Sequence, residues 1–171
     1  MNHSLTTGFS FGSTSGVITT LGLMVGLHSG THSKWAVLGG IITIAIADAF
    51  SDALGIHISE EAENTHTTAE IWMATVSTFV AKFIVALTFT IPVLLWEFSS
   101  TIRIPVIGAE FPVAIVVAIA WGLLLILSVS IKMAHKQGNK ISQVVFEHMI
   151  IVIAVIIITH YVGHWVAGFS E

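Results

Sequence analysis

Five long apolar runs constrain the fold of this 171-residue chain more than any other feature. A helix needs about 17–25 mostly apolar residues to cross the hydrocarbon core of a bilayer. Runs of that length cover residues 9–28, 35–58, 71–96, 111–131 and 144–166. Because lipid offers a backbone no hydrogen-bond partner, each run is predicted to be an α-helix. The sequence therefore predicts an all-α membrane protein with five transmembrane helices in a single domain, residues 1–171.

The composition agrees with an integral, multi-pass membrane protein whose partner is the lipid bilayer. Hydrophobic residues make up 54% of the chain and charged residues only 9%, whereas a soluble domain carries about 25% charged residues. Six lysines and arginines are too few for a nucleic-acid-binding surface. The absence of cysteine excludes thiolate metal sites. No basic segment precedes the first apolar run, so we expect no cleaved signal peptide.

The distribution of lysine and arginine predicts the orientation. An odd number of spans places the N-terminus and the loops 59–70 and 132–143 on one side, and the C-terminus on the other. The first side carries three lysines, all in the loop 132–143, and the second carries Lys34 and Arg103. Loops rich in positive charge stay in the cytoplasm. We therefore expect a cytoplasmic N-terminus and an external C-terminus.

Two aspartates, Asp48 and Asp52, lie one helical turn apart inside the second run. A carboxylate at that depth costs about 2.5–3.5 kcal/mol, so it usually serves a function. At about 1.5 Å per residue, Asp52 lies level with Ser15 on the first run, and Asp48 lies level with Thr19 and with Lys82 on the third. Oxygen ligands at matched depths suit a hard or borderline divalent cation. We predict a metal site there, with Lys82 as a coupling group or counter-ion.

Two interpretations of these charges remain open. Repulsion between the two carboxylates favours a shared proton when no cation is bound, and a divalent ion would displace it. Lys82, if it reaches Asp48, would leave Asp52 as the exchanging group. In the alternative interpretation, Asp48, Asp52 and Lys82 form a buried ion-pair network in a structural or assembly protein without transport activity.

Other polar residues gather near the ends of the predicted spans. Glu60 and Glu63, in the acidic loop 59–70, are either ligands that capture a cation or a solvated helix end. His160 and His164 lie one turn apart near the end of the last run. They are candidates for an exit ligand pair or a proton relay, or they are histidines that only form hydrogen bonds.

Glycines give the first run a smooth face. Gly8, Gly12 and Gly16 recur every four residues, and Gly22 and Gly26 repeat the spacing. Such a face lets another helix backbone approach closely. Five spans cannot divide into two equal repeats, so a symmetric pathway would have to form between chains. We therefore expect a homodimer that meets through the first helix.

Several segments, in matching order over nearly the whole chain, resemble the vacuolar iron transporter family. They read FGSTSGVITTLGLMVGL, GGIITIAIADAFSDALGIHISEEAE, STFVAKFIVALTFTIPVLL, KMAHKQG and ITHYVGHWVAG. Plant and yeast members move Fe²⁺ and Mn²⁺ into vacuoles, and the family has prokaryotic relatives. The resemblance implies a dimeric transporter that exports Fe²⁺ or Mn²⁺ from the cytoplasm by proton antiport. It also implies a prokaryotic plasma membrane and no cofactor besides the transported ion.

The chain departs from the family pattern at the residues that matter for transport. Ser15 stands where the family has an aspartate in its first helix, and Asp52 stands where it has a methionine in its second. A family glutamate falls near Ile44, and the long cytoplasmic metal-binding hairpin is reduced to the loop 59–70, with Glu63 at the position of a family glutamate. The loss of a thioether and the gain of carboxylates favour Mn²⁺ or another oxygen-preferring ion over iron.

The same residues argue against an enzyme. An intramembrane aspartyl protease needs two aspartates on different helices, whereas Asp48 and Asp52 share one run. A membrane cytochrome b needs facing histidines at matched depth, and the middle of each apolar run contains none.

Overall fold

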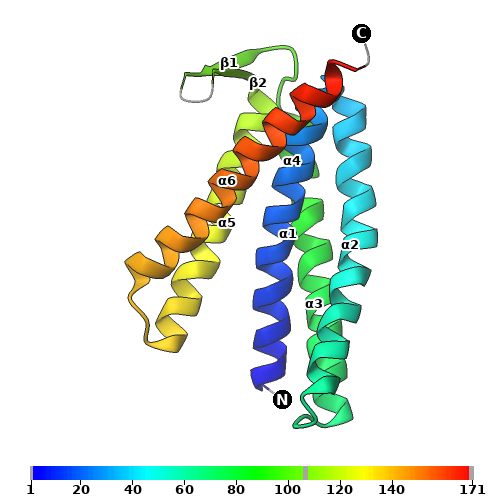
Figure 1. The fold of residues 1–171 in the computed structure, drawn as a ribbon, viewed down its shortest axis with the longest axis vertical. Helices are drawn as coiled ribbons and strands as arrows, with labels where there is room; N and C mark the ends of the chain where they lie inside the picture. Colours follow the sequence, from blue (N-terminus) through cyan, green and yellow to red (C-terminus); the bar gives the residue numbers. More distant parts are fainter. Residues whose placement is uncertain (1, 106–107, 170–171) are drawn as a thin grey trace.

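The computed structural model describes residues 2–105 and 108–169, most of which are helical. Their elements, in chain order, are α1 (Asn2–Thr31), α2 (Lys34–Ala62), α3 (Thr68–Thr88), α4 (Thr90–Leu95), β1 (Thr101–Ile104), β2 (Ala109–Pro112), α5 (Val113–Gln137) and α6 (Ile141–Ala167). Within those described ranges, five helical segments are long and apolar enough to cross a membrane, with α3 and α4 together forming the third. The predicted five-span, all-α membrane architecture is confirmed (Figure 1).

Side-chain caps mark the starts of two helices, α2 and α3. Ser33 accepts a hydrogen bond from the backbone N–H of Ala36 (3.3 Å) and starts α2. Thr67 and Glu70 form a reciprocal capping box at the start of α3. These caps satisfy backbone groups that a helix end leaves without partners. Hydropathy detects only the part of each helix that suits lipid.

The third predicted span is interrupted at Phe89, between α3 and α4. Pro92 has no N–H to donate to the carbonyl of Thr88, four residues earlier, so the regular helix cannot continue through this point. The hydroxyl of Thr90 donates to the carbonyl of Leu87 (2.7 Å) at the break. A kink near Pro92 therefore follows directly from the sequence.

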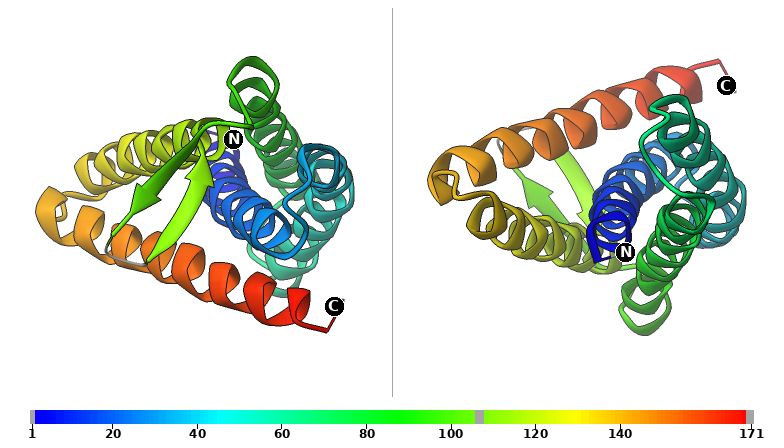
Figure 2. Two further views of the ribbon diagram at one scale, coloured as in Figure 1. Left: turned by 90° about the horizontal axis from the view of Figure 1, so that it is seen from above. Right: turned by 90° about the horizontal axis from the view of Figure 1, so that it is seen from below.

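An antiparallel hairpin, β1–β2, stands where the sequence predicts a loop and the start of the fourth span. Placing residue 111 in that span was wrong, because Phe111 belongs to β2 and the helix begins two residues later. Strands of four residues are too short to show a clear alternation of polar and apolar positions. Phe111 is fully buried and contacts the rings of His28 and His160 (centroids 5.8 and 5.2 Å). The hairpin covers one end of the bundle (Figure 2).

Helix α1 lies at the centre and contacts α2, α3, α5 and α6 (Figure 2). Its glycines form two groups, the first against α3 and the second against α6: Gly8, Gly12 and Gly16, then Gly22, Gly26 and Gly30. A side chain on Gly12 would overlap the carbonyl of Thr78. The predicted homodimer seam on this glycine face was therefore wrong, because α3 and α6 of the same chain already occupy it.

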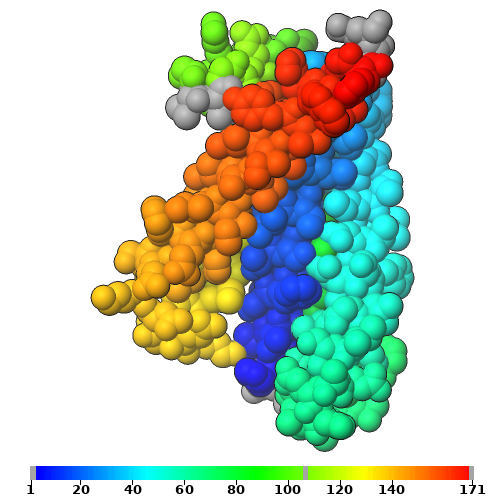
Figure 3. All heavy atoms as spheres, in the orientation of Figure 1, coloured from blue at the N-terminus to red at the C-terminus, as the bar shows by residue number. Residues whose placement is uncertain are grey.

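The hairpin of α5 and α6 leans away from the N-terminal half of α1 (Figure 1). The space-filling view shows the resulting gap between the loop end of this hairpin and α1 (Figure 3). The hydrophobic core lies nearer the other end, where Leu21, Met24, Phe89, Ile115 and Ile126 are buried together. The two ends of the chain lie at opposite ends of the bundle, as five spans require (Figure 1).

Candidate functional site

The side chain of Lys82 brings together charges from two helices and a hydroxyl from a third. Its ammonium nitrogen Nζ lies 2.5 Å from Oδ2 of Asp48 and 2.5 Å from Oδ2 of Asp52. It also donates a hydrogen bond to the hydroxyl of Ser15 (2.9 Å). We call these four residues, Ser15, Asp48, Asp52 and Lys82, the aspartate–lysine cluster.

Close helix packing positions this cluster. Asp48 and Asp52 are four residues apart on α2, so they share one face of the helix. Small residues on the same side of α2, Ala45 and Ala49, are fully buried and leave room for a near neighbour. On α1, Gly16 lies against the backbone of Lys82, where an added Cβ would be 3.3 Å from the Lys82 carbonyl oxygen. The Lys82 side chain thus begins at the α1–α3 contact and ends at α2.

The members of the cluster differ in exposure. The Lys82 side chain is only 1% exposed, whereas those of Asp48 and Asp52 are 26% and 19% exposed. Asp52 accepts a hydrogen bond from the ammonium, while Asp48 meets it as an ion pair without hydrogen-bond alignment. With each group in its ordinary charge state, two carboxylates and one ammonium leave a net charge of −1. The cluster therefore attracts a further positive charge.

Thr19 belongs to the predicted ligand set but is not gathered into the cluster. Its hydroxyl donates to the carbonyl of Ser15, one turn back on α1 (2.9 Å). That bond uses the single proton of the hydroxyl and leaves its oxygen lone pairs able to meet a cation. Thr19 lies one turn from Ser15 on the same face of α1, and Ser15 is the α1 side chain that reaches the lysine.

Glu60 and Glu63, also in the predicted metal set, lie in a different place, near the end of α2. Both approach Nε2 of His66, at 3.3 and 3.4 Å. Eight residues separate Glu60 from Asp52, or about 12 Å along a helix. The predicted set of metal ligands is thus divided between the aspartate–lysine cluster and a carboxylate–imidazole group at the α2–α3 turn.

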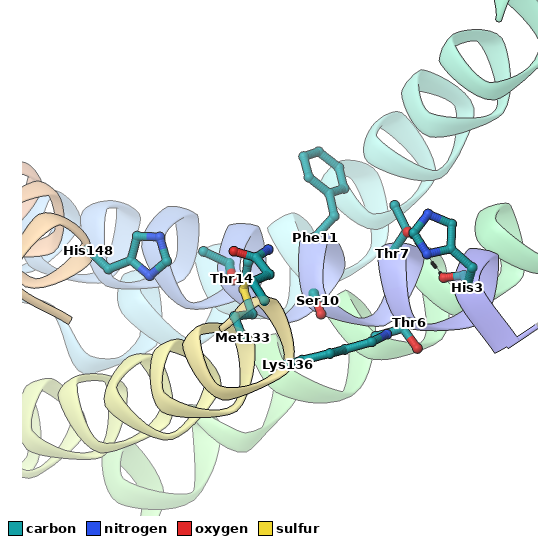
Figure 4. A pocket seen from close by; sticks show the side chains of 10 residues that line it. His3, Thr6, Thr7, Ser10, Phe11, Thr14, Met133, Lys136 and His148 are labelled. Carbon is teal, nitrogen blue, oxygen red and sulfur yellow. Dashed lines mark hydrogen bonds between the residues drawn. The ribbon is translucent and has the colours of Figure 1, made fainter. Parts of the chain in front are cut away.

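A crevice separates the N-terminal half of α1 from α5 and α6, with a volume of about 550 Å³ (Figure 4). Lys136 extends across it toward Thr6, and His148 lies at the end far from His3 (Figure 4). A second cavity beside it is lined in part by Ser13, whose buried hydroxyl has no hydrogen-bond partner among the described residues. Ser13 and Ser15 point to nearly opposite sides of α1, since two residues turn a helix by about 200°. The crevice and the cluster therefore flank α1.

Contact of Lys82 with both Asp48 and Asp52 was one of the two interpretations that the sequence left open. The i, i+4 spacing of the two aspartates was the available signal, because an ammonium between them reaches both. Two histidines at the end of α1, His28 and His32, were not among the residues singled out from the sequence. Among the residues described, no three histidine or acidic side chains are gathered as ligands for one metal ion.

Comparison of the chain with protein-family models, with curated proteins and with solved structures finds no match.

Proposed function

We propose that this protein transports a divalent transition-metal ion, Fe²⁺ or Mn²⁺, out of the cytoplasm in exchange for protons. The observation that carries the proposal is the aspartate–lysine cluster itself, a group with net charge −1 inside three membrane-spanning helices. Ionisable groups are costly at such depth, and they usually mark the pathway of an ion or a proton.

The lysine ammonium lies where a cation would bind. Two carboxylates and the Ser15 hydroxyl surround it, and these oxygen donors suit Mn²⁺ or Fe²⁺ better than a soft ion. A metal ion that takes both carboxylates leaves the buried ammonium without a counter-charge. Burial disfavours an unpaired charge, so Lys82 then gives up its proton.

This exchange has a simple charge balance. Before binding, two carboxylates and one ammonium sum to −1; afterwards, a divalent ion, two carboxylates and a neutral amine sum to 0. One proton leaves for each metal ion that binds. From the sequence alone, the exchangeable proton was expected on the aspartate pair, or on Asp52 if Lys82 reached Asp48. Contact of Lys82 with both aspartates favours Lys82 instead.

Two sequence features support the direction and the cargo. The excess of lysine in the loop 132–143 favours a cytoplasmic N-terminus. The resemblance to the vacuolar iron transporter family favours Fe²⁺ or Mn²⁺ as cargo and transport away from the cytoplasm.

Transport in liposomes tests the proposal. We expect the purified protein to take up Mn²⁺ in response to a pH gradient, and Asp52→Asn to abolish the uptake. Glu61→Gln is the matched control, since it removes an exposed carboxylate on the same helix, and its uptake should equal that of the parent. Absence of flux for every first-row divalent ion, with the protein folded, would contradict the proposal.

The alternative, a structural ion-pair network, is favoured by one observation, the complete burial of Lys82. Replacing a buried charge network by neutral groups of similar size is often harmless to stability. The triple variant Asp48→Asn, Asp52→Asn, Lys82→Met should therefore fold. Loss of metal transport in this folded variant supports the transporter, and unchanged transport supports the structural role.

A further inference from the structure

Histidines from two helices meet at the end of the bundle that the β1–β2 hairpin covers. A cavity of about 320 Å³ lies there, and its lining includes the four residues that we call the histidine cluster: His28, His32, His160 and His164. The first two lie at the end of α1 and the last two near the end of α6. Only the α6 pair was a candidate from the sequence. The glycine contacts between α1 and α6 bring the two pairs to one cavity.

The ring spacing of one pair fits shared coordination, and the other pair must close by about 1 Å. Two imidazoles on one tetrahedral metal ion, with metal–nitrogen bonds of about 2.0–2.1 Å, have ring centres roughly 5 Å apart. The ring centres of His28 and His32 are 5.3 Å apart, and those of His160 and His164 are 6.5 Å apart. Phe111 contacts both His28 and His160, so one aromatic ring lies against both pairs.

One histidine already has the support that a metal ligand needs. Nδ1 of His160 lies 2.7 Å from the hydroxyl of Ser29. When Nδ1 carries the proton and donates it to this hydroxyl, Nε2 is left with a free lone pair. Metal-bound histidines commonly donate their second ring N–H in this way, which fixes the orientation of the ring.

A second histidine lacks a partner. His28 is only 4% exposed, and its Nδ1 is buried with no hydrogen-bond partner in the described part of the chain. Buried polar atoms are normally paired, and His28 lines the cavity. A ligand in the cavity would supply the missing partner.

The third histidine has a left-handed backbone conformation, which is uncommon for residues other than glycine. His32 has φ +50° and ends α1 with its N–H donating to the carbonyl of His28 (2.8 Å). Glycine is the usual residue at such a left-handed helix end. The His32 ring therefore lies next to His28 at a position where glycine would be under less strain.

The charge around the cavity suits a cation. Glu110 is among the lining residues, whereas no lysine or arginine from residues 2–105 or 108–169 is. Arg103, the cross-strand neighbour of Glu110, is not part of the lining either. Four imidazoles and a carboxylate are the donors that borderline divalent ions prefer.

We propose that the histidine cluster binds one borderline divalent transition-metal ion of the Zn²⁺ type. The side chains must rotate to do so, because no three of them already converge as ligands in the structure described here. His28 lies thirteen residues beyond Ser15 on α1, or about 20 Å along the axis. The site is therefore separate from the aspartate–lysine cluster and does not depend on the proposed transport function.

Calorimetric titration of Zn²⁺ into the metal-free, full-length protein in detergent micelles tests this site. We expect one Zn²⁺ per chain at the cluster, with affinity at least about tenfold lower in His160→Gln and in His32→Gly. His32→Gly removes the ring while keeping the left-handed backbone that glycine readily adopts. The double variant, His32→Gly with His160→Gln, should lose this binding altogether.

Two controls make the result specific. His148→Gln removes a ring with the same kind of serine contact, since Nδ1 of His148 lies 2.7 Å from the Ser130 hydroxyl, and its Zn²⁺ affinity should match the parent. Asp52→Asn should also leave this affinity unchanged. Failure of the transport proposal can therefore be distinguished from failure of the histidine-cluster proposal.

The proposal is overturned if the double variant binds Zn²⁺ as tightly as the parent, if the parent binds none, or if His148→Gln weakens binding equally. Should His160→Gln fail to fold, His32→Gly alone decides, because the ring that it removes is exposed.

Discussion

The unit formed by α1, α2 and α3 and the hairpin of α5 and α6 pack in contrasting ways. In the first unit, the glycines in the N-terminal half of α1 lie so close to α3 that a side chain on Gly12 would overlap a backbone carbonyl. The hairpin of α5 and α6 leans away from that half of α1, and a crevice of about 550 Å³ lies between them (Figures 1 and 4). It approaches α1 only toward the end that carries His28.

The two regions also differ in where their lysines lie. The fully buried Lys82 lies in the closely packed unit, where both aspartates reach it. The exposed lysines of the hairpin, Lys132 and Lys136, line the looser crevice and its neighbouring cavity. A charge in close packing depends on fixed partners, whereas a charge beside a crevice can be hydrated. The two regions should therefore respond differently to similar changes.

The largest expected effect is that of Lys82→Met. It leaves two carboxylates facing each other without the ammonium, which should cost about 3–5 kcal/mol in the free energy of unfolding. Unfolding of the variant and the parent in detergent micelles measures this difference.

Lys132→Met is the matched control in the hairpin. It makes the same substitution at an exposed position, so the free energy of unfolding should change by no more than about 0.5 kcal/mol. Equal losses of unfolding free energy in Lys82→Met and Lys132→Met would contradict the difference in packing between the two regions.

A smaller effect is expected from adding one methyl group to α1. Gly12→Ala forces the new Cβ against the Thr78 carbonyl and should cost about 1–3 kcal/mol. Gly26→Ala, on the side that faces α6, meets its nearest atom at 3.4 Å, an ordinary contact. It should be neutral, or stabilising by about 0.5–1 kcal/mol, because alanine favours a helix. Thermal unfolding of both variants compares the two faces, and a reversed order would contradict the packing described.

The smallest effect concerns the contact between the two regions at the α3–α4 break. There the indole N–H of Trp121 on α5 donates to the hydroxyl of Thr88 (3.0 Å). Thr88→Val removes this acceptor and should cost about 0.5–1.5 kcal/mol. Ser128→Ala removes a hydroxyl that donates to the Leu124 carbonyl within α5, and it should cost less. Equal unfolding free energies for these two variants would show that the inter-helix bond contributes nothing.

Much of the architecture follows from the sequence because length and hydropathy are local properties. The five spans and the interruption near Pro92 are of this kind. The β1–β2 hairpin was missed because its strands are too short to reveal a period. The glycine face was recognised, but the partner was not, since glycine spacing shows that a helix comes close and not whether it belongs to the same chain.

The candidate site was predictable only in part. Matched depths along straight helices placed Ser15, Asp48, Asp52 and Lys82 together, because depth depends on residue number alone. Thr19 shares the Ser15 face of α1, one turn along, and its hydroxyl bonds the Ser15 carbonyl, so its role as a ligand stays a prediction. The meeting of His28 with His160 required the crossing of α1 and α6, which no local pattern encodes.

The central claim is that a metal ion takes the place of the Lys82 ammonium and releases its proton. Calorimetric titration of Mn²⁺ in two buffers of different ionisation enthalpy measures the number of protons released per ion bound. For the parent protein we predict about one proton per Mn²⁺, the count that the charge balance of the cluster gives. For Lys82→Arg, whose side chain cannot lose its proton, we predict a folded protein with greatly weakened Mn²⁺ binding. Tight binding of Mn²⁺ without proton release, or unchanged binding in Lys82→Arg, would contradict the account.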